Sequence, residues 1–250
     1  MLGFGRQRAT VVVTTAPIRM NNDQRHFFYR KLHSLLGVLP LGGFIAEHFV
    51  SNAFILGGQK SYESAVGWLL NMPKPLLWTL EILTIAAPLL FHGVYGLIIA
   101  RQAKNNTGNY SYARNRNFML QRLTSFYLLV FIIYHVWSTR FTGHFTTNYT
   151  PDRIDQATGL IQSQQSIYYF MLEKLSGNWA LGAVYFLGVA SAAFHFGNGM
   201  WTFCIAWGIT VGKKAQDNAR VVFSGIGLAL FALGTATVWH LVSTPNPFKV

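Results

Sequence analysis

An all-α, polytopic membrane protein with five transmembrane helices is predicted by three features of this 250-residue sequence. Hydrophobic residues make up 51% and charged residues 11%, and the mean hydropathy is +0.28, which is not the balance of a soluble domain. Five apolar stretches each exceed the roughly 20 helical residues that cross a bilayer. They are residues 32–54, 76–101, 118–140, 178–210 and 220–242. Third, the basic residues gather in alternate connections between these stretches.

The individual spans carry further signals. Pro40 and Pro88 lie within the first and second spans, and each is expected to kink its helix because proline lacks a backbone donor. The fourth span is too long to lie straight along the membrane normal. The longest connection, about 141–177, contains the apolar stretch Tyr168–Leu172. This stretch is compatible with an interfacial helix or with a solvated loop.

The charge distribution predicts the orientation. Of the 20 Lys and Arg residues, fourteen precede the first span or lie around the second and fourth connections, and six lie on the opposite side. The positive-inside rule therefore places the N-terminus in the cytoplasm and the C-terminus outside. We expect a basic cytoplasmic tail (1–31), a transmembrane domain (32–242) and a short outer tail (243–250). The net charge of +12 then reflects topology and contact with membrane lipids, and no nucleic-acid partner is expected.

Four histidines each lie inside a separate apolar stretch, where an unpaired imidazole is costly. They are His48, His92, His135 and His195. Any one of them, taken alone, is equally compatible with a packing or proton-relay role. Iron porphyrin takes one axial nitrogen from each face, so four histidines on four helices can hold two haems in a four-helix haem-binding bundle. Cys204 is the single cysteine, so any four-cysteine iron–sulfur cluster must belong to a partner.

The depth of each histidine in the membrane indicates how the four histidines pair. At about 1.5 Å per residue, His48 and His135 lie about 24 and 25 Å from the inner ends of their helices, whereas His92 lies only about 14 Å from the inner end. His195 is the remaining ligand, past the middle of an inward-running helix. We therefore pair His92 with His195 at an inner level and His48 with His135 at an outer level.

Other polar residues lie near these levels. His33, Ser34 and Arg122 are candidates to bind haem propionates at the inner end, although Arg122 can also snorkel to the lipid surface. Glu47 and Glu81 lie at membrane depth and are candidates for a quinone site, which must exchange protons. Glu81 is the better candidate, and a structural hydrogen bond is the alternative for it. The remaining histidines, His26, His144 and His240, suit ordinary interfacial roles.

Several segments together resemble the dihaem cytochrome b membrane anchor of succinate:menaquinone and fumarate:menaquinone oxidoreductases. They are Arg30–Gly37, Glu47–Asn52, Phe91–Gly96, Lys104–Tyr112, His135–Arg140 and Phe194–Trp201. The resemblance implies two b haems with the same histidine pairs, and menaquinone as acceptor. It implies a flavoprotein partner with FAD and an iron–sulfur partner, in a respiratory-chain and tricarboxylic-acid-cycle complex of the cytoplasmic membrane. The number of protomers, including a higher oligomer, stays open.

The direction of catalysis is a separate question. Some fumarate-reducing members of this family carry a glutamate two residues before the fourth ligand, where this sequence has Ala193. This difference favours succinate oxidation, with a fumarate reductase anchor running in the opposite direction as the alternative. The cytochrome b subunit of a hydrogenase or formate dehydrogenase is a further alternative. The segments quoted above argue against it. A haem-free transporter or scaffold is the last alternative, and haem absorbance discriminates it.

Overall fold

The computed structural model describes residues 20–104, 107–110, 112–141 and 166–245, and all regular structure in these ranges is helical. The longer helices are α1 (Asn22–Val38), α2 (Pro40–Ala53), α3 (Gly58–Leu70), α4 (Lys74–Leu80), α5 (Ala87–Gln102), α6 (Ala113–Val136), α7 (Ile167–Leu175), α8 (Trp179–Ala206) and α9 (Lys213–Ser243). Three short segments extend them: the 3-10 helix η1 (Phe54–Gly57) and the π-helices η2 (Glu81–Ala86) and η3 (Trp137–Phe141).

Five helical paths in the described residues are long and apolar enough to cross a membrane. They are Asn22–Leu69, Lys74–Gln102, Ala113–Phe141, Trp179–Ala206 and Lys213–Ser243. The predicted all-α, polytopic membrane fold is therefore confirmed. Helix α1 begins ten residues before the predicted first span, because Asn21 and Gln24 form a reciprocal capping box. Residues 22–31, expected as part of the tail, are thus the first turns of a helix.

Both predicted proline positions coincide with interruptions of the helical path. Helix α1 ends at Val38 and α2 starts at Pro40, so the first span is built from two helices in succession. In the second span, Pro88 lies in the first turn of α5, directly after the π-helix η2. Proline has no backbone N–H and cannot donate the usual helical hydrogen bond. The wider π-helical turn just before Pro88 accommodates this missing bond.

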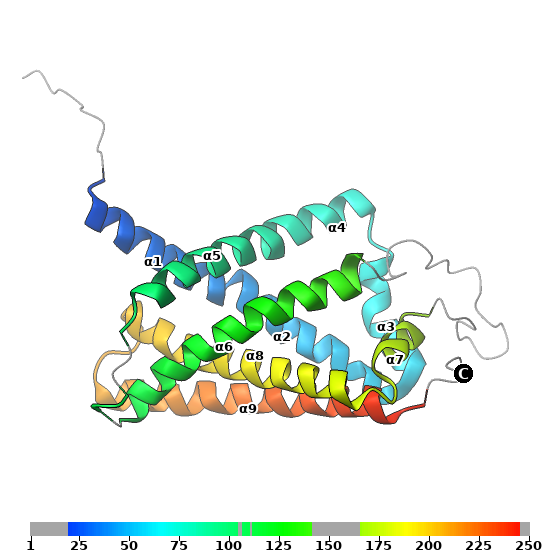
Figure 1. The fold of residues 1–250 in the computed structure, drawn as a ribbon. Helices are drawn as coiled ribbons and strands as arrows, with labels where there is room; N and C mark the ends of the chain where they lie inside the picture. Colours follow the sequence, from blue (N-terminus) through cyan, green and yellow to red (C-terminus); the bar gives the residue numbers. More distant parts are fainter. Residues whose placement is uncertain (1–19, 105–106, 111, 142–165, 246–250) are drawn as a thin grey trace, which may run out of the picture.

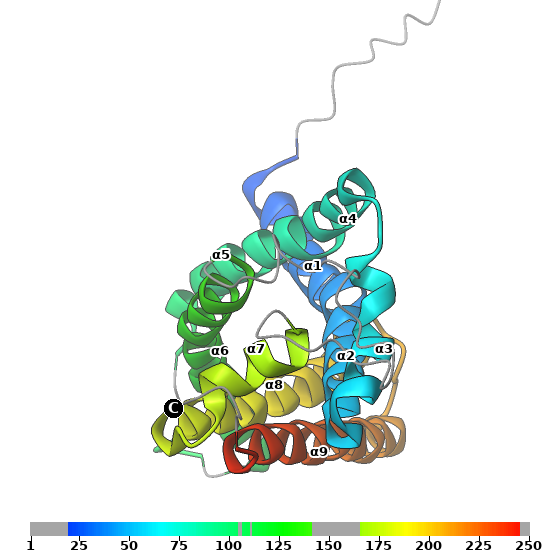
Figure 2. The ribbon, with the colours of Figure 1, turned by 90° about the vertical axis from the view of Figure 1, so that its right-hand side faces the viewer.

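The crossing helices form one bundle. Figure 2, a view along the bundle, shows α1 with α2, α5, α6 and α8 around a common interior, while α9 packs against α8 and α2 from outside. Helices α8 and α9 approach closely through two glycines. A Cβ on Gly197 would lie 2.7 Å from the Phe223 carbonyl oxygen, and one on Gly227 would lie 3.0 Å from the Ala193 carbonyl oxygen. Small residues at such crossings let two backbones pack directly in a membrane.

Two short helices, α3 and α7, lie at the same end of the bundle (Figure 1). They share a buried cluster with the ends of α8 and α9 that includes Ile55, Tyr62, Leu172 and Leu241. The stretch Tyr168–Leu172 is therefore part of a helix that packs on protein, which decides between the two expectations for it. This end is covered by the chain's own helices.

Candidate functional site

The four membrane-embedded histidines lie in two pairs. The ring centroids of His48 and His135 are 5.8 Å apart, and those of His92 and His195 are 6.2 Å apart. In both pairs the ring planes cross at 80°. An iron ion held by two imidazoles, with metal–nitrogen bonds of about 2 Å on either side, separates ring centres by roughly 6 Å. Each pair thus has the spacing of two axial ligands, and the partners are those expected from depth.

The inner pair is held by α1 and α6. His92 Nδ1 lies 3.0 Å from the carbonyl oxygen of His33, whose ring also stacks on the His92 ring with centroids 4.1 Å apart. His195 Nδ1 lies 3.5 Å from Thr124 Oγ1. A Cβ on Gly37 would lie 2.6 Å from His92 Nδ1, so glycine at this position leaves the room that the imidazole occupies.

The outer pair has different neighbours. His135 Nδ1 lies 3.3 Å from the Tyr185 hydroxyl. His48 Nδ1 lies 3.4 Å from the amide nitrogen of Asn52, which also donates to the His48 carbonyl oxygen at 2.8 Å. The Tyr62 hydroxyl donates to the Asn52 amide oxygen at 3.3 Å. Both outer rings are therefore approached by side chains, whereas one inner ring is approached by backbone.

These contacts determine which nitrogen of each ring is available. In all four rings Nδ1 faces a protein group. Among the described residues, the side-chain hydrogen bonds of these four rings are all made at Nδ1 and none at Nε2. No group of three or more His, Cys, Asp and Glu side chains in the described ranges is arranged to hold a metal ion, but haem iron takes only two axial ligands from protein. The donor set fits axial ligation of haem through Nε2.

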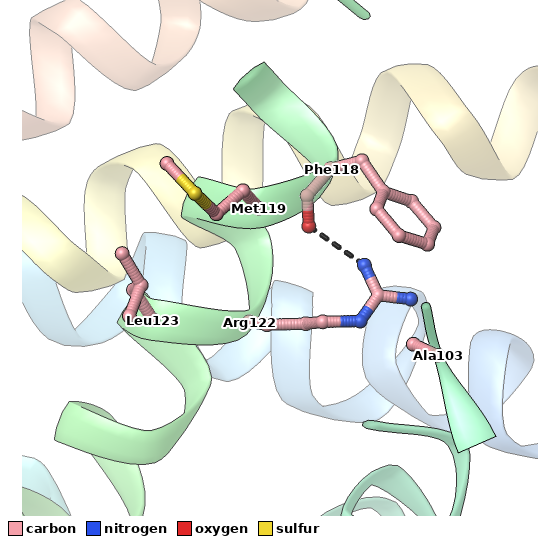
Figure 3. Close-up of a pocket in the computed structure, with 5 residues that line it drawn as sticks. All are labelled: Ala103, Phe118, Met119, Arg122 and Leu123. Carbon is pink, nitrogen blue, oxygen red and sulfur yellow. Dashed lines mark hydrogen bonds between the residues drawn. The ribbon is translucent and has the colours of Figure 1, made fainter. Parts of the chain in front are cut away.

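The inner-end candidates do not gather at one point. The Ser34 hydroxyl accepts a hydrogen bond of 2.9 Å from the Trp207 indole nitrogen. Arg122 borders an open cavity of about 120 Å³ between the end of α5 and the start of α6, shown in Figure 3. Its guanidinium donates to the Phe118 carbonyl oxygen at 2.7 Å, while its buried Nε has no hydrogen-bond partner among the described residues. Of the three candidates, only His33 touches a member of the inner pair.

The two carboxylates differ sharply in environment. Glu47 is exposed on α2. Glu81, at the start of η2, forms an ion pair of 2.9 Å with Arg140 in η3, and their side chains are 33% and 28% exposed. Near this pair, Lys174 of α7 donates to the carbonyl of Ser138, and burial lowers the pKa of Lys174 below its usual range. Glu81 therefore lies among polar groups at the same helix end as His135.

Among the other histidines, His26 contacts the Tyr95 hydroxyl at 2.6 Å and the Gln102 side chain at 3.1 Å. His240 lies on α9, outside both pairs. His144 lies outside the described residues. Neither of the two described, His26 and His240, joins a histidine pair.

Sequence reasoning identified the histidines but missed several of their neighbours. Thr124, Tyr185 and Asn52 each contact a paired histidine, and Arg140 pairs with Glu81. A signal existed for Asn52, which lies four residues after His48 and hence one helical turn away on the same face. The contacts across helices depend on how each helix is rotated, which spacing alone does not give.

Membrane-crossing helices that present histidines to one another in two pairs define a class of protein, the membrane-embedded cytochromes. The chain is 37% identical over 221 residues to the "Succinate dehydrogenase cytochrome b558 subunit" of Bacillus subtilis (strain 168), and this match covers 88% of the chain and 100% of the relative. The chain belongs to the family of cytochrome b membrane subunits of succinate dehydrogenase. No family model and no solved structure matches it.

Proposed function

We propose that this chain carries electrons through two b haems, from an iron–sulfur subunit at its inner end to menaquinone near its outer end. His92 and His195 are the axial ligands of the inner haem, and His48 and His135 those of the outer haem. The observation that carries this proposal is the spacing of the two pairs, 6.2 Å and 5.8 Å between ring centroids. When bound, each haem iron supplies a reversible one-electron change.

The chain's own residues orient and enclose the two sites. The oxygens that face Nδ1 of His92, His195 and His135 restrict ring rotation and would leave Nε2 to bind a haem iron. His48 is approached at Nδ1 by the amide nitrogen of Asn52 instead. Gly37 lets α1 approach the inner site closely, and the ring of Phe131 stacks on His135 at the outer site with centroids 5.7 Å apart. His33, Ser34 and Arg122 are the proposed propionate contacts, and the unpartnered Nε of Arg122 is the most direct support for this role.

The N-terminus lies on the cytoplasmic side in this proposal. The ends of α5 and the starts of α1, α6 and α9 then share one basic face in the cytoplasm, as the fourteen-to-six division of Lys and Arg supports. Such a face suits an electron-donating iron–sulfur partner, which in turn binds the flavoprotein that carries FAD and oxidises succinate. The complex is placed in the cytoplasmic membrane on the same grounds.

Menaquinone is proposed to bind at the outer end, beside Glu81 and Arg140. Quinone reduction takes up two protons with two electrons, so the site needs a group that exchanges protons with water. The partly exposed Glu81 has this access, and Arg140 holds it at 2.9 Å. Glu47, exposed on α2, is the weaker choice. A purely structural ion pair between η3 and the second span is the competing role.

The direction of electron flow is proposed to be succinate oxidation. Ala193, two residues before His195, is 3% exposed and its carbonyl lies against Gly227 of α9. A carboxylate for transmembrane proton transfer is therefore missing at this position, which supports a reaction that moves electrons without coupled proton transfer through this helix.

The test is a reduced-minus-oxidised optical spectrum of the purified chain, with haem extracted and counted per polypeptide. Two b-type haems per chain are expected. A fully folded preparation without haem absorbance would overturn the ligand assignment and favour a transporter or assembly scaffold. Co-purification with a flavoprotein and an iron–sulfur protein separates the proposed complex from a hydrogenase or formate dehydrogenase cytochrome.

A further inference from the structure

Two hydroxyl groups that are not ligands touch one histidine of each pair. The first is Thr124 on α6, 3.5 Å from Nδ1 of His195. The hydroxyl proton of Thr124 is directed at the backbone, because Oγ1 lies 2.8 Å from the Leu120 carbonyl oxygen and 3.1 Å from that of Gln121. The oxygen therefore presents a lone pair, and not a proton, to His195.

The second hydroxyl belongs to Tyr185 on α8, which is 7% exposed and lies 3.3 Å from Nδ1 of His135. Its ring packs edge-on against Phe131, at 5.3 Å, and Phe131 in turn stacks on the His135 ring. The Ser138 side chain is a second hydrogen-bond partner of the phenol. The hydroxyl is thus held in position beside Nδ1 of His135.

An imidazole that binds iron through Nε2 keeps its proton on Nδ1, so Nδ1 must donate. An acceptor for that proton fixes the ring orientation and raises the basicity of the ligand, which favours ferric over ferrous iron. We propose that Thr124 and Tyr185 are positioning residues, Thr124 for His195 of the inner haem and Tyr185 for His135 of the outer haem. This inference rests on the haem ligation proposed above.

The two sites differ in what remains when the hydroxyl is removed. At the inner pair, His92 keeps the His33 carbonyl oxygen at 3.0 Å as an acceptor that no substitution removes. At the outer pair, His48 faces the amide nitrogen of Asn52, which is a donor. Within the described residues, Tyr185 is then the acceptor on which the outer pair depends. Its removal has the larger expected effect.

The experiment is a potentiometric titration of the purified complex, followed optically and by electron paramagnetic resonance of the ferric haems. Tyr185→Phe is expected to retain two haems per chain, to raise the midpoint potential of the outer haem and to leave the inner haem unchanged. Thr124→Val is expected to raise the potential of the inner haem alone and by a smaller amount. Thr124→Ser, which keeps the hydroxyl, should restore the wild-type value.

Tyr127→Phe is the matched control. The Tyr127 hydroxyl donates to the Val184 carbonyl oxygen at 2.7 Å and so links the same two helices, α6 and α8, without touching a ligand. Neither potential should move in this variant. Unchanged potentials and unchanged resonance positions in both Tyr185→Phe and Thr124→Val, with two haems bound, would overturn the inference while leaving the haem ligation intact. Equal shifts of both haems in either variant would also overturn it.

Discussion

The inner and outer histidine pairs share spacing and ring angle but differ in their surroundings. The inner pair is bordered by a stacked imidazole, a backbone carbonyl, a threonine hydroxyl and a glycine. The outer pair is bordered by Tyr185 and Asn52, lies on the same helix end as the Glu81–Arg140 ion pair, and is covered by α3 and α7. In the proposed function, the neighbours of the inner pair suit a site that transfers electrons only. The neighbours of the outer pair suit a site where electron transfer is coupled to proton uptake.

In the proposed function, one bundle holds two similar pairs of metal ligands, and the groups around each pair separate their roles. Protonatable groups with access to water are needed only where a quinone is reduced. Variants that act on one pair and spare the other are the way to test this.

The largest effect is expected from removal of a ligand. His135→Ala should abolish the outer haem and retain the inner one, and His195→Ala should do the reverse, because each iron loses one of its two axial ligands. Haem counted per polypeptide should fall from two to one in each variant, with different absorbance bands lost. Loss of both signals in either variant would show that the pairs are not independent.

A second large effect is expected from Gly37→Ala. The added methyl group would fall on the His92 imidazole, which the contacts with His33 hold in place. The inner haem should be lost or displaced and the outer one retained, as measured by haem content and the ferric resonance spectrum. Gly43→Ala is the matched control on the next helix, since a Cβ there meets nothing within 4 Å. Equal haem content in the two variants would contradict the close approach of α1 to the inner pair.

A moderate effect is expected from Glu81→Gln, which keeps the shape of the side chain but removes its proton exchange. Quinone reduction by succinate should fall by about tenfold or more. The minimum expected loss is smaller than the roughly hundredfold lower end of the usual range for general acid–base groups. Haem content and electron transfer to an artificial acceptor that bypasses the quinone should remain. Glu47→Gln should have a smaller effect on the same assay. The reverse order of the two variants would move the proposed quinone site to α2.

The smallest effect is expected from Asp217→Asn at the inner end of α9. This carboxylate pairs with Lys213 at 2.6 Å, but the two side chains are 44% and 91% exposed, and solvent screens such surface pairs. The Tm of the complex and the content of both haems should stay unchanged. A loss of the inner haem alone would show that the inner site depends on α9 as well as on α1 and α6.

The fold and the histidine pairs were accessible from sequence for a physical reason. A bilayer fixes the length of a span and the rise of a helix fixes depth, so His48 and His135 could be placed at one level and His92 at another. The start of α1 at Asn22 was missed because hydropathy does not register a capping box, although Asn21 and Gln24 have the required spacing.

The rest depended on information that spacing does not contain. Helix α7 is too short and its apolar run too brief to be distinguished from a loop until its buried face is known. The contacts of Thr124 and Tyr185 need the rotation of α6 and α8 about their axes. The ion pair of Arg140 with Glu81 needs two π-helical segments, η2 and η3, which have no compositional signature.

The π-helical segments also bear on how this protein can change over time. A π turn corresponds to one residue inserted into an α-helix, and each residue turns the helix by about 100°. Deleting one residue from η2 would therefore rotate Glu81 by about a quarter turn or more relative to His92, with both side chains still present. A deletion in η3 would do the same to Arg140 relative to His135. A lineage that lost either insertion would keep the four histidines in register and lose the carboxylate–guanidinium pair. In the proposed function, loss of a single codon would then impair the quinone site and leave both haem sites in place.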